Sequence, residues 1–188
     1  MKIKPFTAII ILVFVCALVG VGQKPSRRPR TTPPPTPAPT PKSTLSIEAG
    51  IIYKSTGNQP VARTKFRLLD TDLADIISGI GLPPDFESKQ VLDDPRANLI
   101  YNWALAVEYS NDKSVIVKIA LTIGQHTVQD ATTDFNGKAE FDDVKPGHYF
   151  IYAKTETRGG FAIWNLPIEI KPGKNSVALD QDNAAVAF

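Results

Sequence analysis

The sequence predicts a mainly β protein: a β-sandwich that is interrupted by a largely helical insertion and preceded by a signal peptide and a proline-rich linker. Three observations predict this class. Apolar and polar residues alternate along short segments from Leu45 onward, as in strands with one buried side. Turn signals recur after residue 128 at intervals of about 8–12 residues. Residues 70–126 instead place apolar side chains at helical spacing.

The N-terminal segment 1–22 has the pattern of a signal peptide. Two lysines precede an apolar run from Ala8 to Gly22, which is shorter than the about 20 apolar residues that a membrane span needs. Gly20 and Gly22 are small enough to precede a cleavage site. Cys16 follows Val-Phe-Val rather than a small residue, which excludes a lipoprotein signal. Because it is the chain's one cysteine and lies in the leader, the mature protein is expected to have no disulfide.

Residues 23–44 form a basic linker with eight prolines between Pro25 and Pro41. Proline fixes φ and removes donors, so this segment is predicted to be a disordered, extended polyproline-II stalk. Four of its basic residues, Lys24, Arg27, Arg28 and Arg30, directly follow the apolar run. Positive charge there resists translocation, which keeps an uncleaved signal-anchor open as an alternative. The basic cluster also leaves open an association with anionic lipid or a wall polymer. We expect a secreted, periplasmic or envelope-anchored protein.

The charge is divided unevenly between the linker and the domain 45–188. Seven of the 21 basic residues and none of the 19 acidic residues lie in residues 1–42, so the remainder has a formal charge of −5. Because nucleic acids need a positive face, this acidic body argues against a nucleic-acid partner.

The first strands are predicted in "LSIEAGIIY" from Leu45 and in "ARTKFRLLD" from Ala62, with a turn at Gly57-Asn58. In the second half, Asn136-Gly137 is the strongest hairpin signal because both residues tolerate positive φ. The strand after it is expected to break at Asp142-Asp143. Further turns are predicted at Pro146-Gly147, Gly159-Gly160 and Pro172-Gly173.

The insertion 70–126 is predicted to contain at least two helices. One is capped by Asp70 or Thr71 and stops at Gly81, and the next is capped by Asp94 with Pro95 at its first position. Residues 113–126 suit a helix by spacing and a strand by their β-branched content, so both stay open.

Two blocks carry a resemblance to a known family. "GIIYKSTGNQPVARTKFRLLD" and "TTDFNGKAEFDDVKPGHYFIYAKT" resemble the carboxypeptidase regulatory-like domain family, over residues 45–69 and 128–182. Ala62-Arg63 departs from the usual Gly-Ala of that pattern. The matching motif residues are turn and core residues by their own chemistry: Asp134, Gly137, Pro146, Gly147 and Tyr149.

The resemblance implies a seven-stranded, Greek-key, transthyretin-like sandwich, a fold shared with starch-binding-like and Cna-B-like modules. It also implies a non-catalytic domain of a secreted or cell-envelope protein. The residues agree with that expectation, because neither a His-Glu-x-x-His nor a Gly-x-Ser-x-Gly motif is present. We therefore expect no enzyme, no cofactor and no metal.

Two site alternatives stay open beside this expectation. Four aspartates near one turn, at positions 130, 134, 142 and 143, are oxygen ligands of the kind that Ca²⁺ prefers. A Lys–Asn isopeptide, as in some Cna-B-like domains, would need a buried Lys, Asn and acid, and the sequence does not place those three. His126 and His148 are the chain's two histidines, and His148 is expected to be exposed.

Aromatic side chains are the remaining candidates for partner contacts: Trp103, Tyr101 and Tyr109 in the insertion, and Phe161 and Trp164 in a strand. Trp164 shares parity with Ala162 and Leu166, so packing in the core is its default. The leading hypothesis is an interaction module that binds an envelope protein or glycan, with the insertion 70–126 as its contact surface. A carbohydrate-binding domain with an exposed aromatic platform is the alternative, followed by an uncharacterised hydrolase.

Overall fold

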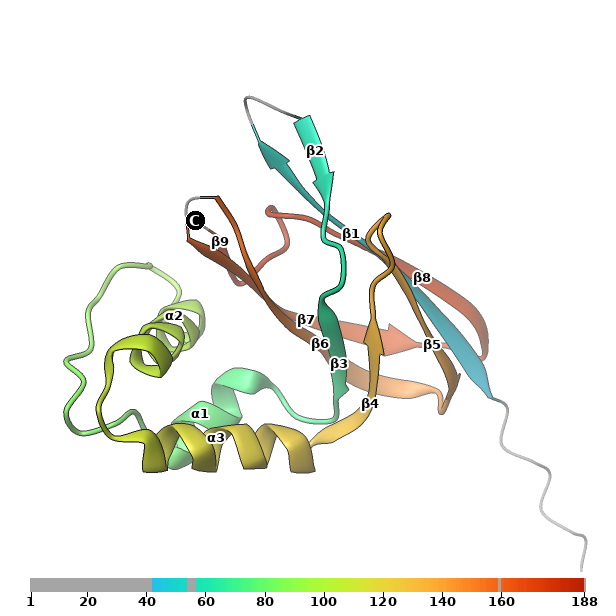
Figure 1. The fold of residues 1–188 in the computed structure, drawn as a ribbon. Coiled ribbons are helices and arrows are strands. Elements are labelled where there is room, and N and C mark those ends of the chain that lie inside the picture. The colour runs from blue at the N-terminus through green and yellow to red at the C-terminus, as the bar shows by residue number, and fades with distance from the viewer. Residues whose placement is uncertain (1–41, 54–56, 159, 188) are drawn as a thin grey trace, which may run out of the picture. The chain divides into compact units, whose positions relative to one another are not determined.

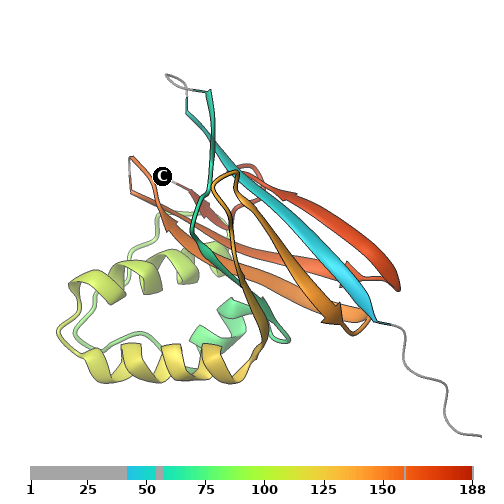
Figure 2. The same cartoon turned by 45° about the vertical axis from the view of Figure 1, so that its right-hand side comes forward.

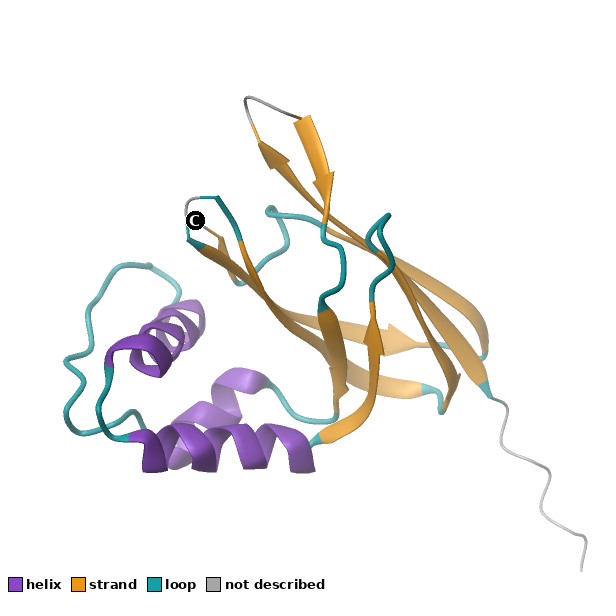
Figure 3. Ribbon diagram, viewed as in Figure 1, coloured by secondary structure: helices purple, strands orange, loops and turns teal. Residues whose placement is uncertain are grey.

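The computed structural model describes residues 42–53, 57–158 and 160–187, which form two β-sheets and a layer of three helices (Figures 1 and 3). The described residues belong to a unit that spans Pro39–Phe188. The predicted leader, the linker up to residue 41 and Gly159 lie outside the described residues. None of the helices within the described ranges is long and apolar enough to span a bilayer.

The first sheet is built around β1, its longest strand. It contains β1 (Ser43–Tyr53), β2 (Gly57–Pro60), β5 (Lys138–Val144) and β8 (Gly173–Leu179). β5 and β2 pair antiparallel with the first and last parts of β1, and β8 pairs with β1 in parallel. Along β1, Leu45, Ile47 and Ala49 are buried whereas Ser46 and Glu48 are exposed, so one face of this sheet forms the core and the other faces solvent.

The second sheet has the strand order β4-β3-β6-β7-β9, and all its pairings are antiparallel. Its strands are β3 (Lys65–Leu69), β4 (Thr127–Thr132), β6 (Gly147–Glu156), β7 (Phe161–Ile170) and β9 (Val186–Ala187). β6 and β7 form the longest hairpin, with Gly147 opposite Ile170 and Glu156 opposite Phe161.

The two sheets pack face to face over one apolar core. Leu45 and Phe141 from the first sheet and Phe66, Ile151 and Trp164 from the second are fully buried in it. The Phe66 and Trp164 rings lie 5.7 Å apart between centroids. This interdigitation of two inner faces is the packing of a β-sandwich.

Three helices separate β3 from β4: α1 (Leu73–Ile80), α2 (Pro95–Tyr109) and α3 (Lys113–Gln125). Each begins at an aspartate whose carboxylate accepts a hydrogen bond from the backbone N–H two residues on: Asp72, Asp94 and Asp112. The cap of α1 is therefore Asp72 and not Asp70 or Thr71 as predicted, because those two side chains bond His126 instead. The stretch 113–126, which the sequence left open, is helical.

The helices form a second apolar core against the outer face of the second sheet. Ile77 of α1, Trp103 of α2 and Ile119 of α3 are buried with Phe161 and Ile163 of β7. Figure 2 shows the helices on the side of this sheet, away from β1 and β8. One sheet is therefore covered on both faces, while the other has one open face.

Three turn predictions need correction. Gly57-Asn58 begins strand β2 rather than a turn. Asn136-Gly137 does bend the chain, but not in a hairpin: β4 pairs with β3 and β5 pairs with β1, so the bend crosses from one sheet to the other. Asp142-Asp143 lies inside β5, where Asp143 takes a positive φ of 56° beside a register shift, so a bulge replaces the predicted break.

The strand count also differs from the seven that the family resemblance implies, because the described residues contain nine strands. β2 and β9 are the shortest, with four and two residues.

Candidate interaction surfaces

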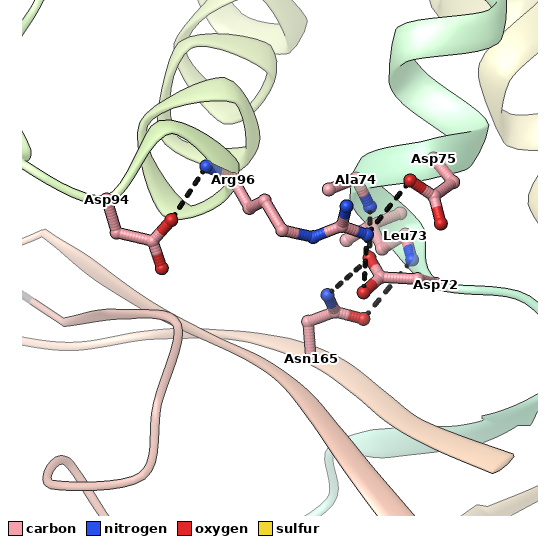
Figure 4. Close-up of polar contacts among 7 residues, drawn as sticks. All are labelled: Asp72, Leu73, Ala74, Asp75, Asp94, Arg96 and Asn165. Carbon is pink, nitrogen blue, oxygen red and sulfur yellow. Dashed lines mark hydrogen bonds and ion pairs between the residues drawn. The ribbon is translucent and has the colours of Figure 1, made fainter. Parts of the chain in front are cut away.

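Asp72 joins the helical layer to the second sheet (Figure 4). Its carboxylate accepts hydrogen bonds from the Ala74 backbone N–H at 2.7 Å and from the Asn165 side-chain amide of β7 at 2.8 Å. The side-chain carbonyl of Asn165 in turn accepts a hydrogen bond from the Leu73 backbone N–H at 3.2 Å. The Arg96 guanidinium of α2 lies 2.7 Å from Asp72, so α1, α2 and β7 meet at one carboxylate.

Arg96 has two further partners besides Asp72. Its guanidinium pairs with Asp75 of α1 at 2.9 Å, and its backbone N–H donates to the Asp94 carboxylate that caps α2. The hydrogen bond and the charge of Asp72 raise the pKa of Arg96, with a smaller contribution from Asp75. A cavity of about 350 Å³ beside the cluster is lined by Asp94, Asn165 and Asp182 among others. These bonds join α1, α2 and β7, so the cluster anchors the helical layer to the sheet.

His126 forms the arrangement that most resembles a catalytic pair. Its Nδ1 lies 2.7 Å from the Asp70 carboxylate and 3.0 Å from the Thr71 hydroxyl. Both partners contact the same ring nitrogen, so no relay from carboxylate through imidazole to hydroxyl exists. Burial opposes ionisation of Asp70, but the hydrogen bonds from His126 and Thr71 outweigh it and lower the pKa of Asp70.

The four aspartates considered for calcium do not share a site. Asp130 pairs with Lys65 at 3.3 Å and Asp143 with Lys42 at 2.7 Å. The Asp134 carboxylate accepts from the backbone N–H groups of residues 136 and 138, which lowers its pKa. Over the described ranges, no group of three or more His, Cys, Asp or Glu side chains is placed to hold a metal ion.

Four of the five aromatic candidates lie in or beside the two cores. Trp164 is 0% exposed and its indole N–H donates to the Asp180 carbonyl at 2.8 Å. Trp103 is 5% exposed and Phe161 is 7% exposed, and Tyr101 stacks on Phe161 with 6.2 Å between ring centroids. Only Tyr109 of the five is strongly exposed, at 70%. The two tryptophans therefore do not form an exposed platform for a sugar ring.

The outer face of β5, β1 and β8 is the open surface that the sandwich leaves. It is hollowed by about 600 Å³, and its exposed side chains are small or polar: Ser46, Glu48, Lys138, Glu140, Ser176 and Ala178. Ile47, Ala139 and Val177 also line the hollow, but their side chains pack in or against the main core. The Lys138 ammonium and the Glu48 carboxylate lie 3.7 Å apart across the β1–β5 pair, and both side chains are more than half exposed. We call this surface the open face.

The sequence did not single out the open face or the Asp72 cluster. The alternation of Ser46 and Glu48 with buried residues showed that one side of β1 faces outward. It did not show that β8 completes the face, because β8 lies far away in the sequence and pairs in parallel.

Comparisons with known proteins give structural similarity only. No family model matches the chain, and no curated protein matches it. Among solved structures, a candidate carbohydrate-binding protein from Pseudomonas aeruginosa is 16% identical with a TM-score of 0.41, over 75% of this chain and 89% of that one. The basal pilin SpaB of Lactobacillus rhamnosus GG is 12% identical with a TM-score of 0.36, over 77% and 98%.

The minor pilin GBS52 of Streptococcus agalactiae is 11% identical with a TM-score of 0.34, over 74% of this chain and 44% of that one. The sandwich architecture itself rests on the strand pairing and the core described above. The resemblance to the carboxypeptidase regulatory-like family stays a prediction.

Proposed function

We propose that this chain is a non-catalytic interaction module that binds a protein partner through the open face, outside the cell and on a proline-rich stalk. The observation that carries the proposal is the difference between the two sheets. The second sheet is covered on its outer face by α1, α2 and α3, whereas the open face is hollowed and uncovered among the described residues.

The chemistry of the open face supports binding rather than catalysis. Ser46 and Ser176 offer hydroxyls, and Glu48, Glu140 and Lys138 offer charges of both signs. Among the described residues, neither the open face nor the Asp70–His126 pair provides a nucleophile beside an oriented base. A hollowed surface that offers hydroxyls and charges of both signs suits a protein partner with complementary charges.

The predicted contact surface, the insertion 70–126, is the alternative to the open face. It buries Ile77, Trp103 and Ile119 in the second core, and Tyr109, Val117 and Leu121 are exposed on it. Deletion of the insertion would uncover Phe161 and Ile163 on the sheet, so point substitutions test the two surfaces more cleanly.

A glycan partner is the second candidate. The hydroxyls and carboxylates of the open face are groups that hydrogen-bond sugars, but both tryptophans are buried and offer no stacking surface.

The experiment compares two arginine substitutions of exposed residues in the full-length protein. Ser46→Arg fills the open face, and Ala120→Arg adds the same side chain to the exposed side of α3. Partners are captured from envelope fractions and tested on a glycan array, then measured individually by surface plasmon resonance. The proposal predicts that Ser46→Arg abolishes binding to a protein and that Ala120→Arg does not. Binding that is lost only with Ala120→Arg would return the contact to the insertion, and a glycan as the ligand would favour the second candidate.

A further inference from the structure

β8 is an outer edge of the first sheet and pairs only with β1 among the described residues. Figure 2 shows it outermost in that sheet. Its seven residues pair in unbroken register, from Gly173 opposite Ser43 to Leu179 opposite Ala49. An edge strand of this kind presents unpaired backbone donors and acceptors, and proteins that must stay monomeric usually blunt such edges.

The other edges of the two sheets each carry a blunting feature. β5 has the bulge at Asp143, and β2 is short and ends in Pro60. β4 carries Asp130 and faces a register shift in β3, while β7 contains Pro167 and is capped by the two-residue β9. Bulges, prolines, charges and short length all discourage pairing between molecules.

β8 has none of these features except one charge at its start. Its sequence GKNSVAL contains no proline, its register shows no bulge, and Lys174 is its one charged residue. Val177 packs against the main core and Leu179 is buried in it, while Ser176 and Ala178 are small and exposed. Asn183 donates to the Ala178 carbonyl, which has a second lone pair for a further donor.

The distribution of charge along this edge indicates which strand can pair with it and in which direction. Lys171 and Lys174 stand at the start of β8, and Asp180 and Asp182 follow its end. Antiparallel pairing of two copies brings the basic end of each strand to the acidic end of the other, whereas parallel pairing would set like charges together. A two-fold axis near Ser176 satisfies both ends at once.

We infer that β8 pairs antiparallel with β8 of a second copy of this chain, joining two first sheets into one continuous sheet. The backbone of both strands supplies the hydrogen bonds, and the small Ser176 side chains meet near the axis. This inference concerns the edge of the sheet and does not depend on the proposed partner of the open face.

Disulfide cross-linking of the full-length protein tests the geometry. In a Cys16→Ser background, Ser176→Cys places a thiol near the axis, and Glu140→Cys places one on the same face but on the blunted β5. Mild oxidation is expected to give dimers with Ser176→Cys and monomers with Glu140→Cys. Equal cross-linking of the two variants would overturn the inference.

Charge exchange at the axis tests the pairing without oxidation. Ser176→Lys and Ser176→Glu each set like charges together and should weaken the dimer at least about tenfold, whereas an equimolar mixture should recover it. Sedimentation velocity measures the association. Wild-type protein that stays monomeric at the highest soluble concentration, or variants that dimerise as tightly as wild type, would also overturn the inference.

Discussion

The Asn165 amide on β7 donates to the Asp72 carboxylate on α1 at 2.8 Å, joining residues that are 93 positions apart in the chain. Asp72 at the same time caps α1 and pairs with Arg96 of α2. With only 13% of its side chain exposed, the carboxylate depends on these partners to offset the cost of burial. The attachment of the helical layer to the sheet therefore has one identifiable polar centre.

Asp72→Ala should lower the free energy of unfolding by about 2–3 kcal/mol, because it removes a helix cap and leaves the Asn165 amide without its acceptor. Asp75→Ala is the matched control, because Asp75 also pairs with Arg96 but its side chain is 60% exposed. That control should cost less than about 1 kcal/mol. Urea denaturation measures both values, and equal losses would contradict the role given to Asp72.

Gly137→Ala tests the bend that carries the chain from one sheet to the other. Gly137 has a φ of +76°, and a methyl group there would collide with the Ala49 carbonyl oxygen. The substitution should cost about 3 kcal/mol or more, since strain and a steric clash add. Gly124→Ala in α3 meets no atom and should stabilise by about 0.5–1 kcal/mol. A tolerated alanine at position 137 would mean that the bend has a different geometry.

The two tryptophans offer a comparison of their indole N–H groups. The Trp164 N–H donates to the Asp180 carbonyl, whereas the Trp103 N–H is buried without an acceptor. Trp164→Phe should therefore cost about 1–2 kcal/mol more than Trp103→Phe, beyond the similar volume lost at both positions. Thermal and urea unfolding of the two variants give the difference, and a larger loss at position 103 would refute it.

Alkaline pH should destabilise the helical layer through Tyr152. Burial raises the pKa of Tyr152 to about 12, so the folded protein holds the phenol neutral while the unfolded chain ionises it near the ordinary tyrosine value of 10.0. The stabilisation is complete below pH 10 and falls as the pH rises toward 12, by about 2–3 kcal/mol in total. Tyr152→Phe should remove this part of the pH dependence, and Tyr109→Phe, at an exposed position, should leave it in place.

The sequence predicted the individual turns and helices better than it predicted which strands pair with one another. Asn136-Gly137 marked a real bend because its backbone requirement is local, but the partner of the next strand is β1, about ninety residues earlier. Nothing in a local turn signal identifies a distant partner. The N-cap of α2 at Asp94 and the helical spacing in α1 were likewise local and were predicted. The parallel pairing of β8 with β1 depends on the whole fold and was not.

The candidate site was predicted less well for a related reason. Aromatic residues were chosen for their chemistry, but their burial depends on which sheet face the helices cover. Trp164 is buried in the core, as its place on the same strand face as Ala162 and Leu166 predicted. Trp103 lies on the face of α2 that packs on the second sheet, against Tyr152. The open face has small and charged surface residues that carry no distinctive signal in a sequence.

Thiol accessibility at the two outer sheet faces tests the central claim most directly. In a Cys16→Ser background, Ser46→Cys lies on the open face and Ile163→Cys lies beneath the helices, where Ile163 is 0% exposed. Under native conditions the Ser46→Cys protein should react with a thiol reagent at the rate of an exposed cysteine, and the Ile163→Cys protein should react only on unfolding. Equal native rates, or faster reaction at position 163, would contradict a sandwich with one covered and one open outer face.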